Sequence, residues 1–416
     1  MKKSGNNSSR DLINEIISES SGDHFKFIFK NLNNEDKKKF NEIVIQNKFS
    51  PNFLEFIGKN NLYNLFDSSF LENCENQKRR FQINSLHSIR EVHLLNKIFI
   101  SEGLKPLYLK GIALQREYKD VALRPFVDID ILFDRSEILK AYEVLHQKNF
   151  LDPREAQYLN NQNIEDFCRK IHHIHLVTRN GISIELHHRI TRTKFFLCCP
   201  IKKSMLKDTR EVDFYGEKIN IPSINNLVLH QLCHFFSSDF NRLIRTLNDL
   251  RVITKNHNIN FHEILSKINN KKIRKSMLLS LEVINFNNIT IENLNKIRSD
   301  FANDYPNNEI ILEAQKRLFD TSKKITIQGG NLFKNINKPG KVASILVKRI
   351  FPGTNSLIFE YKISKPTKLT ILKKYINYIF LQILKLQGLS SFFHTKKTNH
   401  EYLKHTDIID LWFNRN

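Results

Sequence analysis

Residues 127–133 read Val-Asp-Ile-Asp-Ile-Leu-Phe, and this short stretch decides the fold that we expect. Successive side chains of a β-strand point to opposite faces, so Asp128 and Asp130 share one face while the isoleucines that follow them face the core. Two neighbouring carboxylates on an otherwise apolar strand repel each other and are costly to bury. Because a divalent cation removes that penalty, the stretch predicts a strand that carries a Mg²⁺ site.

A third carboxylate occurs in a similar apolar setting at Glu185, within residues 182–187 (Ile-Ser-Ile-Glu-Leu-His). An Asn-Gly pair separates this stretch from another strand pattern at 171–177, which predicts a β-hairpin. If the second strand of the hairpin lies beside the strand of Asp128, three carboxylates converge and can hold two metal ions about 4 Å apart. The alternative is that the two aspartates end an edge strand in solvent.

The order of these motifs resembles that of a known family. A strand pattern at 106–111 ends in Leu-Lys-Gly, an Arg-Pro pair at 124–125 precedes the aspartates, and Ile-Glu-Leu-His follows at 184–187. This order is similar to that of the nucleotidyltransferase superfamily with the DNA polymerase β-type fold. More narrowly, residues 80–374 resemble the bacterial nucleotidyltransferase family 5. The resemblance implies an α+β fold with a small mixed sheet, helices on one face, additional N-terminal helices and a helical second domain.

The resemblance also implies roles for the acidic residues. Asp128 and Asp130 would bind Mg²⁺, as two ions or with Mn²⁺ as a substitute. Glu185 would be the third carboxylate, either as a metal ligand or to activate the attacking hydroxyl. His187 shares a strand face with Glu185, so we expect it in the cleft as a proton carrier or an orienting residue. A purely structural histidine is the alternative.

A second set of residues is expected, from the same resemblance, to bind the phosphates of a nucleotide. Lys110 is a cation at a glycine turn, and the backbone of Gly111 can approach a phosphate closely at the start of a helix. Arg124 can clamp a phosphate with two hydrogen bonds. For Arg124 the alternative is a salt bridge to Asp120 or Asp134.

Several histidines have two interpretations. Histidines make the predicted hairpin rich in metal-ligand side chains, which leaves a zinc site open although no cysteine spacing accompanies it; they are His172, His173 and His175. His230 and His234 have the four-residue spacing of metal ligands on a helix, but core or capping histidines are the simpler interpretation.

Composition narrows the class of protein. The 416 residues are 40% hydrophobic and 26% charged, so two or three domains are expected and a largely disordered chain is not. With 12 glycines and neither a G-x-G-x-x-G nor a G-x-x-x-x-G-K-[ST] pattern, a dinucleotide-binding loop and a P-loop are not expected. Five cysteines without a C-x-x-C pair, and an N-terminus without an apolar stretch, indicate a reducing, cytoplasmic location.

Residue patterns divide the chain into four regions. They are an N-terminal helical region at 1–75, a nucleotidyltransferase domain at 76–221, a helical domain at 222–320 and a basic region at 321–416. Ser223 is the expected N-cap of the first helix of the helical domain. In the same domain Asp249 either binds substrate or pairs with Arg242 or Arg245.

Positive charge is concentrated in the last of these regions. The chain has a net charge of +22, and residues 321–416 carry 17 Lys and Arg against 4 Asp and Glu. Such a region can meet RNA, anionic lipid or an acidic substrate, or it can be an ordinary solvated surface. Residues 369–386 have an amphipathic pattern that suits either the membrane surface or packing on the protein, and they are too polar for a transmembrane helix.

We therefore expect a nucleotidyltransferase that moves a nucleoside monophosphate group from a Mg-NTP to a hydroxyl or phosphate acceptor and releases pyrophosphate. The acceptor stays open among a sugar phosphate, another small molecule, RNA and a protein side chain. The alternative is a non-catalytic protein on the same fold that binds nucleic acid or another partner with its basic face.

Overall fold

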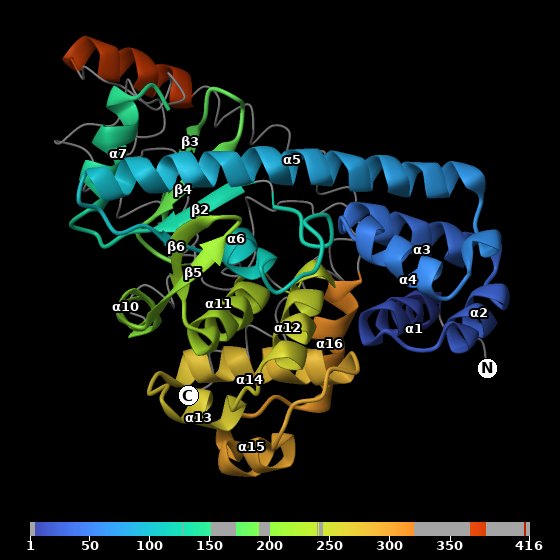
Figure 1. Cartoon of the computed structure of the whole chain (residues 1–416). Coiled ribbons are helices and arrows are strands. Elements are labelled where there is room, and N and C mark those ends of the chain that lie inside the picture. Colours follow the sequence, from blue (N-terminus) through green and yellow to red (C-terminus); the bar gives the residue numbers. More distant parts are fainter. Residues whose placement is uncertain are drawn as a thin grey trace. The chain divides into compact units, whose positions relative to one another are not determined.

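The computed structural model describes residues 5–126, 128–150, 172–190, 200–238, 240, 244–319, 367–379 and 412. The chain divides into two compact units. The first comprises Met1–Phe150, His172–Thr321 and Ile408–Asn416, and the second comprises Leu151–Ile171 and Ser322–Asp407. The described part of the first unit contains a six-stranded sheet and the helices around it (Figure 1).

The sheet has the strand order β3-β4-β2-β1-β6-β5. Its strands are β1 (Leu107–Tyr108), β2 (Asp128–Leu132), β3 (His173–Val177), β4 (Ser183–His187), β5 (Thr209–Phe214) and β6 (Glu217–Pro222). β2 runs parallel to β4 and β1 runs parallel to β6, whereas the other neighbours are antiparallel. The sheet is thus mixed, as predicted, and the acidic motifs lie on its neighbouring strands β2 and β4.

Two hairpins form the two edges of the sheet, and the one between β3 and β4 was predicted from its Asn-Gly turn. Gly181 joins β3 to β4 with a φ of 77°, and Gly216 joins β5 to β6 with a φ of 89°. Glycine adopts such left-handed conformations without the steric cost that a side chain brings. The Asn-Gly turn therefore fixes which residues of β3 and β4 face each other.

One face of the sheet is covered by the long helix α5 (Ser68–Ser101) and by α7 (Ile138–Gln147) (Figure 1). Phe99 of α5 meets Phe133 edge-on with ring centroids 5.0 Å apart. The Tyr108 hydroxyl donates to the carbonyl of Val92 on the same helix. The apolar spacing of the sequence predicts a helix at 77–102, whereas α5 begins nine residues earlier; it ends before Gly103, whose φ is 72°.

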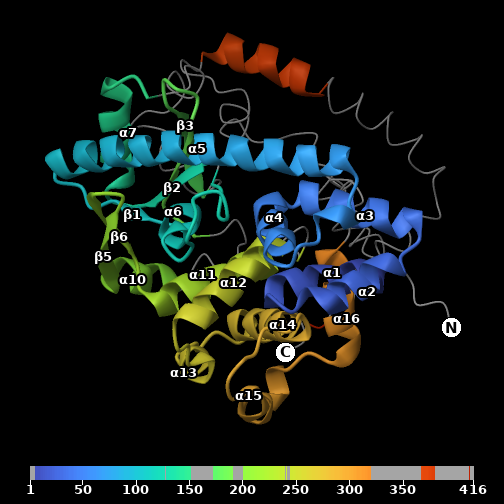
Figure 2. The same cartoon turned by 45° about the vertical axis from the view of Figure 1, so that its right-hand side comes forward.

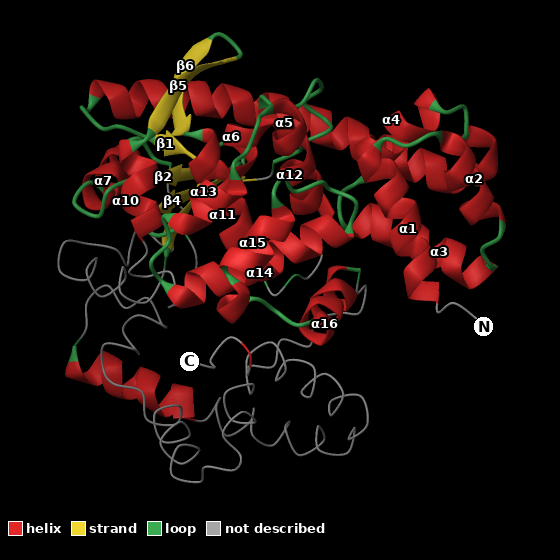
Figure 3. Cartoon of the chain, turned by 90° about the horizontal axis from the view of Figure 1, so that it is seen from below, coloured by secondary structure: helices red, strands yellow, loops and turns green. Residues whose placement is uncertain are grey.

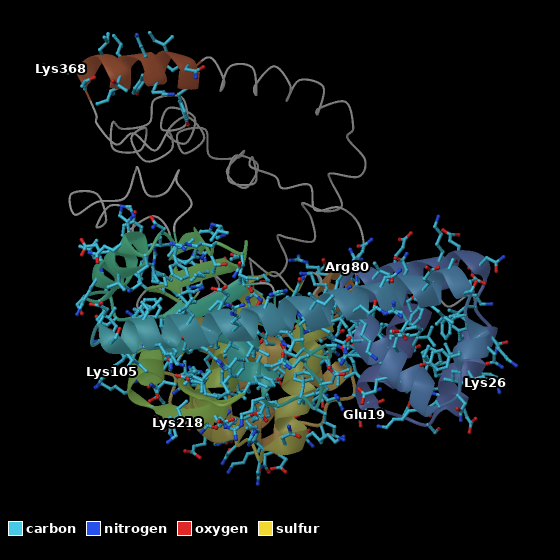
Figure 4. The ribbon with its side chains drawn as sticks, turned by 45° about the horizontal axis from the view of Figure 1, so that its top comes forward. Glu19, Lys26, Arg80, Lys105, Lys218 and Lys368 are labelled. Atoms are coloured by element: carbon cyan, nitrogen blue, oxygen red, sulfur yellow. The ribbon has the colours of Figure 1, made fainter. Side chains whose placement is uncertain are left out.

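The N-terminal helices form a core rich in phenylalanine. They are α1 (Gly5–Ser18), α2 (Gly22–Lys30), α3 (Asn34–Gln46) and α4 (Ser50–Lys59), followed by the short η1 (Tyr63–Leu65) (Figure 2). Rings of neighbouring helices contact one another, for example Phe25 and Phe56 with centroids 5.2 Å apart. After α1, Glu19 binds Arg251 and Lys255 at 3.0 and 2.8 Å, which ties these helices to the helical domain (Figure 4).

α10 (Pro200–Lys207) precedes the last two strands, and the other helices after β4 follow the sheet in sequence; Figure 3 labels most of them. These later elements are α11 (Ile224–Ser237), α12 (Ile244–Asn256), α13 (Phe261–Ser266), α14 (Lys271–Phe286), α15 (Leu294–Asp300), η3 (Ala302–Asp304) and α16 (Asn308–Leu318). Ser223 caps α11 by accepting a hydrogen bond from the backbone of Asn226, as predicted. α11 packs on α14, where the Ser280 hydroxyl donates to the carbonyl of Leu232.

Two local patterns of the sequence remain to be compared with the structure. Asp134 and Ser136 are the sequence candidates for the N-cap of α7, but neither caps it, because Asp134 accepts hydrogen bonds from Ser136 and the N-cap position belongs to Glu137. The sequence also favours a helix at 164–170, which lies outside the described residues, as does most of the basic region.

In the second unit, residues 368–379 form a helix, and Figure 4 labels Lys368 at its start. No described helix is long and apolar enough to cross a membrane.

Candidate functional site

The register between β2 and β4 brings the acidic motifs together. Asp130 is the direct partner of Glu185 in this parallel pair, and Asp128 is the partner of Ser183. Partners in adjacent parallel strands place their side chains on the same face, so all three carboxylates lie on the face opposite to α5. The prediction that the two strands are neighbours is confirmed.

Asp130 is the most enclosed member of the site, with 1% of its surface exposed. Its Oδ1 accepts hydrogen bonds from Lys110 Nζ at 2.6 Å and from His187 Nε2 at 2.7 Å. Burial alone would raise the pKa of Asp130, but these two cationic partners outweigh burial and lower the pKa. Its Oδ2 is buried and has no hydrogen-bond partner among the described residues, so half of this carboxylate is available to a ligand.

Glu185 connects the same cluster to the histidines of the hairpin. Its Oε2 lies 3.1 Å from His187 Nε2, 3.4 Å from His173 Nδ1 and 3.9 Å from Lys110 Nζ. Burial opposes ionisation, yet the hydrogen bond from His187 and the nearby cations lower the pKa of Glu185. The carboxylate is therefore ionised at neutral pH.

Asp128 differs from the other two carboxylates. Burial and the repulsion of Asp130 raise its pKa, although Lys110 acts in the opposite direction. Asp128 also lies outside the tight cluster in which ligand atoms of Asp130, Glu185 and His187 are all within 4.8 Å of one another. Its charge is the one that the described side chains compensate least.

Lys110 reaches the site because of an uncommon backbone conformation. Its φ is 46°, which is rare for a residue with a side chain and costs of order 1 kcal/mol. Burial disfavours its ammonium group, but the carboxylates, above all Asp130, raise its pKa, so the residue stays charged. The next residue, Gly111, is buried, and a Cβ added there would lie 2.4 Å from Phe126 Cβ. This contact gives Gly111 a packing reason to lack a side chain.

Arg124 has a different partner from those predicted. Its Nε donates to Asp249 Oδ1 at 2.6 Å and its Nη1 to the carbonyl of Pro125 at 3.0 Å. The Tyr118 hydroxyl donates to the same oxygen of Asp249 at 2.7 Å. The alternative given for Arg124, a salt bridge, is therefore present, but the partners named for it, Asp120 and Asp134, were wrong. The reason is that α12 brings a carboxylate more than 100 residues away to the buried guanidinium.

Asp249 was expected either to bind substrate or to pair with Arg242 or Arg245, but the described cation that binds its carboxylate is Arg124, while Arg245 interacts with it only electrostatically. Arg242 lies outside the described residues. Arg245 Nη1 instead donates to the carbonyl of Pro125 at 3.1 Å. That carbonyl thus accepts from both Arg124 and Arg245, and a phosphate-binding role for Arg124 stays a prediction.

Two cations that were not predicted at the site interact electrostatically with Asp128. Burial and then the charge of Arg124 lower the pKa of Arg245 to about 10. Burial and then the charge of Arg245 lower the pKa of Lys48, which follows α3. Arg245 was expected only as a partner of Asp249, and no sequence signal marks Lys48, because it is one basic residue among many in a strongly basic chain.

α11 contributes two neutral histidines to the surroundings of Lys110. Burial and then the charge of Lys110 lower the pKa of His230 to about 3 and that of His234 to about 4. Neither belongs to a group of candidate metal ligands among the described residues, so the simpler interpretation of their spacing stands.

The donor set fits a hard divalent cation. Mg²⁺ prefers oxygen ligands, and the site offers the free Oδ2 of Asp130 and the poorly compensated carboxylate of Asp128 on one strand face. Glu185 supplies further oxygens from the neighbouring strand. A divalent ion would relieve the repulsion that raises the pKa of Asp128.

Among known proteins, the chain is similar to one family. Neither the curated proteins nor the solved structures contain a match. A family model described as an uncharacterised nucleotidyltransferase matches residues 33–286, from α3 through α14, which is more than half of the chain. The match includes β2, β4, Lys110 and Asp249 and agrees with the resemblance found in the motifs. The chain therefore belongs to this nucleotidyltransferase family.

Proposed function

We propose that the protein transfers a nucleoside monophosphate group from a Mg-NTP to a hydroxyl or phosphate acceptor. In this reaction an acceptor oxygen forms a bond to the α-phosphorus, the bond from that phosphorus to the β-phosphate oxygen breaks, and pyrophosphate leaves. The observation that carries the proposal is the register of β2 and β4, which sets Glu185 beside Asp130 and two residues from Asp128 on one face. Family membership supports the same reaction class.

Three carboxylates would hold the metal, namely Asp128, Asp130 and Glu185, with two Mg²⁺ ions or with Mn²⁺. The metal neutralises charge that develops on the phosphates and lowers the pKa of an acceptor hydroxyl. The lowered pKa of Glu185 favours its role as a ligand over a role as a proton acceptor. Asp128 supplies the charge that the protein itself leaves least compensated.

Cations around the carboxylates would position the triphosphate. Lys110 is charged and 24% exposed, and its hydrogen bond to Asp130 holds the ammonium at the site. Arg245 is half-buried beside Asp128 and donates to a backbone carbonyl, which leaves its remaining N–H groups for a phosphate. We assign these two residues to the phosphates, together with the backbone at Gly111.

His187 would act by orienting the carboxylates. It is 1% exposed and contacts both Asp130 and Glu185 through Nε2, while its Nδ1 lies 3.2 Å from the carbonyl of Arg189. Burial disfavours the imidazolium, but the two carboxylates raise the pKa of His187. A protonated ring held between two carboxylates fixes their rotamers before a nucleotide binds.

The reaction can be tested without knowing the acceptor. Each NTP, labelled at the α- or the γ-phosphate, is incubated with the full-length protein, Mg²⁺ and a cell extract. The proposal predicts that α-label enters an acceptor and γ-label appears in pyrophosphate, and that Asp128→Asn abolishes both. Stable binding of RNA or of another protein with no transfer of α-label would favour the non-catalytic alternative.

The class of acceptor can be narrowed by salt. The net charge of +22 favours a polyanion such as RNA, whose binding weakens steeply with salt because the release of its counterions gains less free energy in a more concentrated salt solution. Binding of a small neutral acceptor would change little over the same range. A transfer rate that is insensitive to salt between about 50 and 200 mM would exclude RNA as the acceptor.

Contact with a membrane surface is a separate proposal for the helix at 368–379. Three large apolar side chains on this helix are exposed, at the spacing of one helical face, with lysines beside them; they are Leu369, Leu372 and Ile376. Such a face suits the interface of an anionic bilayer. Flotation of the full chain with anionic vesicles, and its loss when Leu372 and Ile376 are both changed to Ser, would support it.

A further inference from the structure

Three histidine rings gather at one side of the acidic site, at the edge formed by β3 and β4. His172 directly precedes β3, His173 begins that strand, and His187 is the register partner of His173 on β4. The ring centroids of His172 and His173 are 4.1 Å apart, and those of His173 and His187 are 5.1 Å apart. One ring nitrogen from each of the three lies within 4.8 Å of the other two.

Glu185 joins these nitrogens into a continuous set of donor atoms. His172 Nε2 lies 2.9 Å from His173 Nδ1, which lies 3.4 Å from Glu185 Oε2. That oxygen in turn lies 3.1 Å from His187 Nε2. Ligands that surround one ion at bond lengths of about 2.1 Å are separated by about 3.0 Å in octahedral and about 3.4 Å in tetrahedral geometry. These three separations lie at or near those values, and rotation of the rings and of the carboxylate would have to bring the remaining pairs of donors into the same range.

The chemistry of the donors indicates which ions would bind. Imidazole nitrogen is a good ligand for Zn²⁺ and related transition metals, whereas Mg²⁺ prefers carboxylates, phosphates and water. Glu185 contributes negative charge, and the buried Oδ2 of Asp130, without a partner among the described residues, adds more next to the cluster. The ammonium nitrogen of Lys110 lies 2.6 Å from Asp130 Oδ1 but 3.9 Å from Glu185 Oε2, so Asp130 is its closer partner.

We propose that His172, His173, His187 and Glu185 bind one divalent transition-metal ion of the Zn²⁺ class, which displaces the proton that His187 Nε2 otherwise shares with Asp130 and Glu185. This site is distinct from the oxygen site that Asp128 and Asp130 offer to Mg²⁺, although the two share Glu185. The ion would hold β3 against β4 and fix the orientation of Glu185. The inference stands on the positions of the donors and does not require the acidic site to transfer nucleotides.

Metal binding by the full-length protein tests the inference directly. Protein stripped with a chelator is dialysed against Zn²⁺, and the retained metal is measured by mass spectrometry, with affinity from competition with a chelating dye. We expect one tightly held Zn²⁺ per chain and preference for Zn²⁺ over Mn²⁺ and Mg²⁺. Co²⁺ in the same site should give visible absorption bands that disappear when Zn²⁺ is added.

Matched variants locate the ion within the hairpin. His173→Gln removes one proposed ligand and should weaken Zn²⁺ binding at least about 10-fold. His175→Gln is the control, because His175 is exposed on the same strand and contacts Ser183 Oγ at 2.9 Å, so its affinity should stay unchanged. Circular dichroism checks that each variant folds. Lack of retained Zn²⁺ in the folded wild type, or equal weakening in both variants, would overturn the inference and identify a hydrogen-bonded histidine cluster.

One further variant separates this inference from the proposed reaction. Asp128→Asn should lose nucleotide transfer yet keep its affinity for Zn²⁺ within about twofold, because Asp128 is not among the four ligands. Loss of Zn²⁺ binding in this variant would show that the two sites are one.

Discussion

Asp130 and Asp249 are two buried carboxylates that look alike locally. Each uses one oxygen to accept two short hydrogen bonds, and each keeps a second oxygen that has no partner among the described residues. The donors are Lys110 and His187 for Asp130, and Arg124 and Tyr118 for Asp249. Local hydrogen bonding therefore does not tell the two places apart.

The surrounding charges separate them. Asp130 has two further carboxylates beside it, Asp128 and Glu185, whereas the charged groups that interact with Asp249 are cations. Crowded like charges are costly unless a cation joins them, while a single paired carboxylate is a stable joint. From this comparison we propose that Asp130 belongs to a ligand site, whereas Asp249 holds α12 to the loop before β2.

The largest expected effect is on activity at the crowded site. Asp128→Asn should lower the transfer rate by about 10³-fold or more, because loss of one metal ligand removes several kcal/mol of transition-state stabilisation. Transfer of α-label at saturating Mg²⁺ measures this. The matched control is Asp134→Asn, which removes an exposed carboxylate just beyond β2 and should retain the wild-type rate. Equal transfer rates in Asp128→Asn and Asp134→Asn would mean that the carboxylates around Asp130 have no special role in the reaction.

The second effect is on stability at the paired site. Asp249→Ala should lower the free energy of unfolding by about 3–5 kcal/mol, because it leaves the buried Arg124 without its carboxylate. Urea unfolding measures this, and transfer per folded molecule should fall less than about 10-fold. If Asp249→Ala loses transfer but keeps its stability, Arg124 binds phosphate as the family resemblance implied, and the ion pair of Arg124 and Asp249 is part of the active site.

Sequence reasoning found the crowded site because its signals are short-range. The alternation around Asp128 and Asp130 fixed their common face, and the Asn-Gly turn fixed the hairpin that carries Glu185. Both strands could be assigned from neighbouring residues, since strand periodicity and turn chemistry are local properties.

The ion pair of Arg124 and Asp249 could not be found in that way. Arg124 and Asp249 are 125 positions apart, and nothing in either segment marks the other as its partner. The same holds for Arg245, which approaches Asp128 only because α12 packs beside the loop before β2. Contacts between elements depend on how the helices pack, and a single sequence does not encode that in any short pattern.

A third prediction concerns pH and sharpens the description of the crowded site. The folded pKa of His187 is raised, so its contribution to stability is fully present below its unfolded pKa of about 6.5 and is lost as pH rises through the folded pKa. The pKa values of Asp130 and Glu185 are lowered, so their contribution is present above about 4 and is lost in acid.

Urea unfolding of the metal-free protein at a series of pH values measures both the loss of stability in acid and the loss of stability at high pH. His187→Gln should flatten the loss of stability above about pH 6.5, while His175→Gln should leave it as in the wild type. A loss of the same size in both variants would mean that His187 is not charged between the carboxylates.

The smallest expected effect is a gain in stability. Asp128→Asn removes the carboxylate whose pKa is raised by burial and by Asp130. The free energy of unfolding of the metal-free variant should therefore rise by at most about 1 kcal/mol, and its melting temperature by roughly 2–4 °C. Thermal unfolding in the presence of a chelator measures it. A clear loss of stability instead would show that the described cations already compensate Asp128 fully.

Binding of a Mg-nucleotide tests most directly whether the carboxylates of β2 and β4 form a metal–triphosphate site. An NTP whose α,β-bridging oxygen is replaced by a methylene group cannot react, so it can be titrated by calorimetry with and without Mg²⁺. We predict saturable binding only when Mg²⁺ is present, and binding at least about 10-fold weaker in Asp128→Asn but unchanged in Asp134→Asn. Equal affinity without a divalent ion, or undiminished binding by the folded Asp128→Asn protein, would contradict the account.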